Sequence, residues 1–130
     1  MGFSPGSVSY YQFGGKREDA KPWEWNCRYF SQFDVIVIVH GAAVSNIVCT
    51  PPGAGVVEIG PETGKISMYR PLVQQLGIAY KFVPFARSRG NFNGIVQPDV
   101  KLLGSAVNSC EETVKSVRRR SLTSSSLLLR

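Results

Sequence analysis

The longest unbroken run of β-branched residues reads Val-Ile-Val-Ile-Val at 35–39, between Asp34 and His40. A short continuous apolar run of this kind predicts a strand that is buried on both faces, as in a parallel sheet. Gly41 and a series of small residues follow directly, which is typical of a turn that leads into a helix. The pattern therefore predicts a strand over 34–39 and a helix after Gly41.

The rest of the pattern alternates helical and extended periods. The expected elements are a helix over 21–32, a turn at Pro51-Pro52-Gly53, a strand over 56–59, a helix over 66–76 that Gly77 ends, a strand over 78–83 and a helix from Pro98 to about Val117. Strands that alternate with helices pair in parallel and are joined by right-handed crossovers. The sequence thus predicts an α/β fold with a Rossmann-like parallel sheet and flanking helices, small enough to be a half-domain.

A chain of 130 residues forms one domain. We expect an irregular lead-in over 1–20, the Rossmann-like unit over 21–117, and a disordered basic and Ser/Leu-rich tail over 118–130. The formal net charge is +6, but the arginines at 118, 119, 120 and 130 all lie in this tail. The charge of the body therefore does not indicate a nucleic-acid partner.

Cys27, Cys49 and Cys110 lack the short spacing of a zinc site. One disulfide with a spare thiol and three free buried thiols both fit this spacing. His40 is the only histidine, which excludes a His-rich metal site. No apolar stretch approaches the ~20 residues that span a bilayer, so we expect no transmembrane segment or signal peptide in this chain.

The candidate chemistry lies where the first strand ends. A glycine turn followed by a helix N-terminus offers backbone N–H groups to an anion, most naturally a phosphate. The candidate diphosphate-binding residues are His40, Gly41, Ala42, Ala43, Ser45 and Asn46. Glu58 interrupts the next apolar strand, where it could bind a ribose or orient His40.

Structural interpretations of the same residues stay open. His40 could bond to backbone at a strand end, and packing alone could require Gly41. Ser45 and Asn46 often hydrogen-bond to their own backbone. Glu58 could point into solvent.

Four motifs in series resemble glycosyltransferase family 61. They are His40-Gly41-Ala42 after the strand, Ser45-Asn46 in the following helix, Pro51-Pro52-Gly53, and Val57-Glu58-Ile59. The similarity covers Tyr29 to Val107. It corresponds to the C-terminal, donor-binding half of a two-domain GT-B enzyme.

The resemblance implies inverting transfer of a sugar from a UDP-type nucleotide-sugar to a glycan or glycoprotein acceptor, without an obligatory metal or other cofactor. It implies that His40, Gly41, Ala42, Ala43, Ser45 and Asn46 bind the donor diphosphate and that Glu58 binds the nucleoside. It also implies a Golgi or endoplasmic reticulum lumen. Half of such an enzyme is expected to bind a donor without transferring its sugar. The alternatives are a non-catalytic nucleotide- or phosphate-binding module and a small flavodoxin-like domain that works through protein contacts.

Overall fold

The computed structural model of the chain describes residues 21–61, 68–85 and 97–127. The irregular lead-in expected over 1–20 lies outside the described residues. So do the first residues of the helix expected from position 66 and the last residues of the tail.

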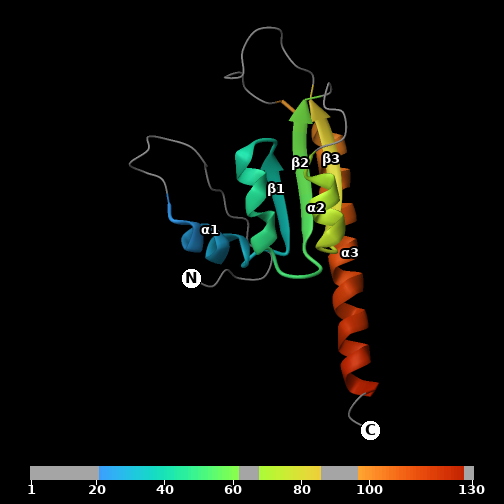
Figure 1. Ribbon diagram of the computed structural model, residues 1–130. Helices are drawn as coiled ribbons and strands as arrows, with labels where there is room; N and C mark the ends of the chain where they lie inside the picture. Colours follow the sequence, from blue (N-terminus) through green and yellow to red (C-terminus); the bar gives the residue numbers. More distant parts are fainter. Residues whose placement is uncertain (1–20, 62–67, 86–96, 128–130) are drawn as a thin grey trace.

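The described residues build one parallel sheet of three strands in the order β1-β2-β3 (Figure 1). Strand β1 spans Val35–Val39, β2 spans Gly55–Pro61 and β3 spans Ala79–Phe85. The register places Val37 beside Val57, and Val57 beside Lys81. The prediction of an α/β fold with a parallel sheet is confirmed.

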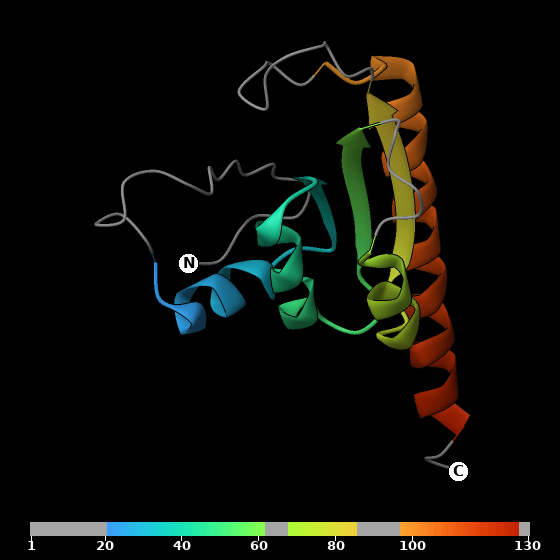
Figure 2. The same cartoon turned by 45° about the horizontal axis from the view of Figure 1, so that its top comes forward.

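Helices cover both faces of this sheet, as Figure 2 shows from a second direction. The 3-10 helix η2 (Ala42–Cys49) and α2 (Arg70–Gln75) pack on one face, and α3 (Val100–Leu127) packs on the other. All residues of β2 from Gly55 to Gly60 are therefore buried. Edge strand β1 is covered less completely, since Val37 and Val39 stay 47% and 48% exposed.

The helix predicted after Gly41 forms as a 3-10 helix, a geometry in which carbonyl groups accept from residues three positions later. The hydroxyl of Ser45 donates to the Ala42 carbonyl and the amide of Asn46 donates to the Ala43 carbonyl, both across three residues. Side-chain bonds of this kind compete with the α-helical pattern. They support the tighter helix here.

Helix α3 approaches the central strand closely at Gly55. A Cβ atom on that glycine would lie 2.9 Å from the Cβ of Cys110, so a larger residue would force the two elements apart. Cys110 is free and fully buried. Burial raises the pKa of its thiol and outweighs the opposite effect of Lys81, so the side chain acts as an apolar packing group.

The predicted end of this helix near Val117 is too early, because α3 continues to Leu127. The residues from 118 to 127 include neither proline nor glycine, so no residue type in them breaks the helix. The guanidinium of Arg118 also donates to the carboxylate of Asp34 at the start of β1. Figure 1 shows the last turns projecting beyond the sheet.

A disulfide joins Cys27 in α1 (Trp23–Phe30) to Cys49 at the end of η2. Of the two cysteine arrangements that the spacing allows, the structure contains one disulfide and a spare thiol. The bond fixes α1 against η2, which otherwise contact each other mainly through Phe30 and its apolar neighbours.

We predict that replacing both Cys27 and Cys49 by alanine lowers the free energy of unfolding by about 3 kcal/mol. The disulfide closes a loop with a sequence separation of 22, and a cross-link of that length restricts the unfolded chain by an amount of this order. Urea unfolding with and without a thiol reductant measures the effect. The reductant should lower the midpoint of the wild-type chain and leave that of the double variant unchanged. Equal wild-type midpoints under both conditions would contradict the prediction.

Candidate functional site

The three strands bring His40, Glu58 and Tyr80 together on the face of the sheet that η2 and α2 cover. His40 directly follows β1, and its backbone N–H donates to the backbone carbonyl of Ile59 at 2.7 Å. Glu58 lies in β2, paired with Ile38 on one side and Phe82 on the other. Tyr80 belongs to β3 and pairs with Val56, two residues before Glu58 in β2, so its hydroxyl reaches the Glu58 carboxylate from the amino-terminal side of the strands. Parallel pairing therefore brings residues far apart in the sequence together on one face of the sheet. His40 lies at the carboxyl end of β1, the end of the strands at which ligands bind in open α/β folds.

The carboxylate of Glu58 is the centre of this cluster. Its Oε1 lies 2.5 Å from Nδ1 of His40, and its Oε2 accepts a hydrogen bond of 2.6 Å from the hydroxyl of Tyr80. The side chain of Glu58 is fully buried, whereas that of His40 is 36% exposed. An ionised carboxylate only accepts hydrogen bonds, and with such a partner Nδ1 would be the donor. The carboxylate thus fixes the orientation of the ring.

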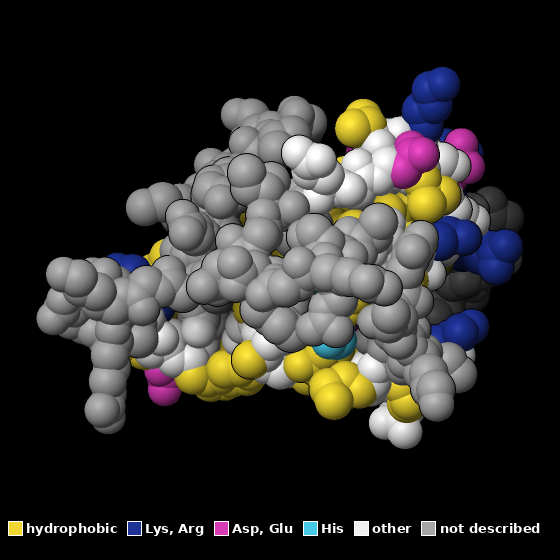
Figure 3. All heavy atoms as spheres, turned by 90° about the horizontal axis from the view of Figure 1, so that it is seen from above, with side chains coloured by type: hydrophobic (Ala, Val, Ile, Leu, Met, Phe, Trp, Pro, Cys, Tyr) yellow, Lys and Arg dark blue, Asp and Glu magenta, His cyan; other side chains and the backbone are white. Residues whose placement is uncertain are grey.

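A second tyrosine holds the turn that follows His40. The hydroxyl of Tyr69 donates to the carbonyl of Gly41 at 3.1 Å, and its ring meets the imidazole edge-on, with centroids 6.1 Å apart. Figure 3 looks onto this end of the molecule, where the histidine colour reaches the surface beside hydrophobic side chains. The imidazole is thus fixed from β2 and from the start of α2, and part of it faces outward.

Gly41 has an extended backbone and begins η2. A Cβ atom at this position would meet no atom of the described residues within 4 Å, so their packing does not require a glycine there. The first N–H groups of a helix have no partner within that helix. A missing side chain beside such groups lets a ligand approach the backbone closely.

The structure brings most of the predicted site residues to this place. His40, Gly41, Ala42 and Ala43 follow one another over the end of β1, with Glu58 beside them. The side chains of Ser45 and Asn46 instead donate to carbonyls of their own helix, and Asn46 is 6% exposed. Local hydrogen bonding is thus the role that the geometry supports for these two side chains.

Sequence reasoning did not identify Tyr69 and Tyr80 as parts of the site. The alternation of residues 78–83 gives the face on which Tyr80 lies. The contact with Glu58 depends on the strand register, which the sequence does not give. The contact of Tyr69 with Gly41 likewise does not follow from the sequence, because Tyr69 precedes a short helix and reaches Gly41 only through the packing of α2.

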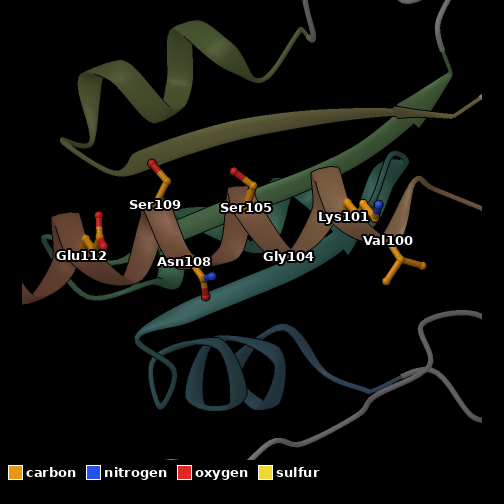
Figure 4. Close-up of a pocket in the computed structure, with 7 residues that line it drawn as sticks. All are labelled: Val100, Lys101, Gly104, Ser105, Asn108, Ser109 and Glu112. Atoms are coloured by element: carbon orange, nitrogen blue, oxygen red, sulfur yellow. The ribbon is translucent and has the colours of Figure 1, made fainter.

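A separate hollow of about 580 Å³ lies along α3. Its lining residues all belong to that helix, and Figure 4 shows Ser105, Asn108 and Ser109 projecting from it in different directions. It includes none of the candidate site residues.

Within the described ranges, no group of three or more His, Cys, Asp or Glu side chains could hold a metal ion. No helix among the same residues is long and apolar enough to cross a bilayer. Comparisons of the chain with protein-family models, with curated proteins and with solved structures find no match.

We predict that Glu58 and Tyr80 are coupled by about 1–2 kcal/mol in a double-mutant cycle of Glu58→Leu and Tyr80→Phe, measured by chemical unfolding. A hydrogen bond to a buried charge is worth more than a neutral one, and the cycle isolates it from the other contacts of both residues. Tyr80→Phe combined with Thr113→Ala on the opposite layer should be additive. Additivity of the Glu58–Tyr80 pair itself would show that their contact contributes nothing.

Proposed function

We propose that this chain is the donor-binding part of a glycosyltransferase of the family 61 type, which binds a UDP-type nucleotide-sugar at the carboxyl end of the sheet. The observation that carries the proposal is the contact between His40 and the buried Glu58, directly before the open turn at Gly41. A carboxylate is costly to bury in an apolar strand, so it is typical of a site with a chemical task.

The arrangement suits a leaving nucleoside diphosphate. Inverting sugar transfer places developing negative charge on the phosphate that leaves the sugar. Without a metal, fixed N–H groups and a positively charged side chain must stabilise that charge. The backbone of Gly41, Ala42 and Ala43 would supply the N–H groups, and the imidazole of His40 would supply a donor beside them.

The proposal gives Glu58 a positioning role. The residue was expected either to bind the nucleoside or to orient His40. Its carboxylate is fully buried and already bonded to the imidazole, which supports the second role. Ser45 and Asn46 would then shape the helix whose first N–H groups bind the diphosphate, since both side chains donate to carbonyls within it.

Two further features support the proposed relation to glycosyltransferase family 61. The crossovers through η2 and α2 lie on one face and α3 lies on the other, the arrangement of one half of a doubly wound sheet. The disulfide between Cys27 and Cys49 suits an oxidising compartment such as the Golgi or endoplasmic reticulum lumen that the resemblance implies. The acceptor, a glycan or glycoprotein, would be bound with the help of a second domain.

We predict that the 130-residue chain binds UDP and that His40→Ala lowers the affinity at least about tenfold, which corresponds to ~1.4 kcal/mol. The substitution removes the only imidazole and leaves the carboxylate of Glu58 without that donor. Isothermal titration calorimetry measures both affinities. Asn108→Ala, on the exposed side of α3, is the control and should bind like the wild type. Absence of UDP binding by the wild-type chain would refute the proposal and favour a domain that works through protein contacts.

We also predict that the 130-residue chain alone transfers no sugar, because in a two-domain enzyme of the GT-B type the donor-binding half does not hold the acceptor by itself. The purified chain is incubated with a UDP-sugar and glycan acceptors, and the UDP released by sugar transfer is measured. Detectable turnover would contradict this expectation. A non-catalytic nucleotide-binding module would also bind UDP without turnover. Addition of an acceptor-binding domain should restore transfer if the chain is part of an enzyme, and should not if it is such a module.

A further inference from the structure

The two ring nitrogens of His40 have different surroundings. Nδ1 lies 2.5 Å from Glu58 Oε1 and is therefore occupied inside the protein. The ring is held in this pose by the backbone bond to Ile59 and by the edge contact with Tyr69. With Nδ1 engaged and part of the side chain exposed, Nε2 is the ring atom that can meet a ligand.

We infer that His40 contacts the phosphate of its ligand through Nε2 and does so only as an imidazolium, with Glu58 and Tyr80 as positioning residues. The identity of the ligand rests on the proposed function, whereas the orientation of the ring does not. A neutral ring whose hydrogen is on Nδ1 presents a lone pair at Nε2, which repels a phosphate oxygen. A protonated ring presents an N–H donor there and forms an ion pair with Glu58 at Nδ1.

The groups around the imidazole agree with this assignment. Glu58 from β2 supplies the one charged side chain that contacts the ring among the described residues. Tyr69, ahead of α2, touches it with a neutral aromatic edge, and Tyr80 from β3 acts on it only through the carboxylate. Helix η2 contributes no charged residue. An imidazolium at this place would therefore lie between a buried carboxylate and the phosphate.

The change of ligand affinity with pH is expected in one direction only. Binding takes up a proton whenever the free ring is neutral, so affinity for a phosphate ligand falls as the pH rises. Histidine is the side chain whose ordinary charge change falls in the range near neutrality. The ligand must not titrate in the same range, which makes UDP-glucose a better probe than UDP, because both of its phosphates are esterified.

The orientation is tested on the free protein. The chain has a single histidine, so its ¹⁵N long-range NMR spectrum contains one imidazole and needs no assignment. In the neutral state we expect the hydrogen on Nδ1. Glu58→Leu, which replaces the carboxylate by a side chain suited to an apolar strand, should shift the hydrogen toward Nε2, the form that free histidine prefers. A neutral wild-type ring with its hydrogen on Nε2 would overturn the assignment without the need for any variant.

The ligand contact is tested by titrating UDP-glucose at about pH 6 and about pH 8.5. We expect an affinity at least about tenfold weaker at the higher pH, and proton uptake when the calorimetry is repeated in buffers of different ionisation enthalpy. His40→Asn should bind weakly with little dependence on pH, while Asn108→Ala should match the wild type at both values. A wild-type affinity that does not change with pH, together with a loss in His40→Asn, would overturn the inference and leave the proposed function standing. No binding at either pH would overturn the proposed function, and the NMR result would still decide the orientation.

Discussion

The buried carboxylate of Glu58 is the constraint on which the arrangement of the candidate site depends most. It interrupts the central strand between Val57 and Ile59, both of which are apolar and buried. A charge in that place is tolerated only when hydrogen-bond donors meet it, and here they come from the end of β1 and from β3. The cluster therefore requires all three strands to be in register at the same time. An apolar residue at position 58 could pack in the sheet without hydrogen-bond donors from the two neighbouring strands.

Other contacts hold the helices against one another and against the sheet. The disulfide between Cys27 and Cys49 ties α1 to η2, the helix that begins at the open turn. Tyr69 holds the same turn from the start of α2. On the other face, the close approach of Cys110 to Gly55 fixes the central strand against α3. The sheet that carries His40 is thus packed by helices on both faces, while the imidazole itself contacts Glu58 and Tyr69.

The polar cluster of the candidate site and the apolar packing of the fold involve different residues. Apolar contacts, the disulfide and α3 would serve equally well around an uncharged sheet. His40, Glu58 and Tyr80 add a polar network to that sheet, and the network ends in a partly exposed ring beside Gly41. A network that is costly to bury and that ends at the surface is the feature that favours a binding site over a purely structural role.

The sequence by itself determined the order of strands and helices and the place where chemistry was expected. Its pattern predicted a strand over 34–39, where β1 forms, and also the turn at Gly41 and parallel pairing, because these features follow from local periodicity and from glycine and proline. It left open which cysteines pair and whether Glu58 points to solvent or to His40. It ended α3 too early and did not give the 3-10 form of η2. Only the tertiary structure decided these points, because register, disulfide pairing and the contacts of Tyr69 and Tyr80 join residues that lie far apart along the chain.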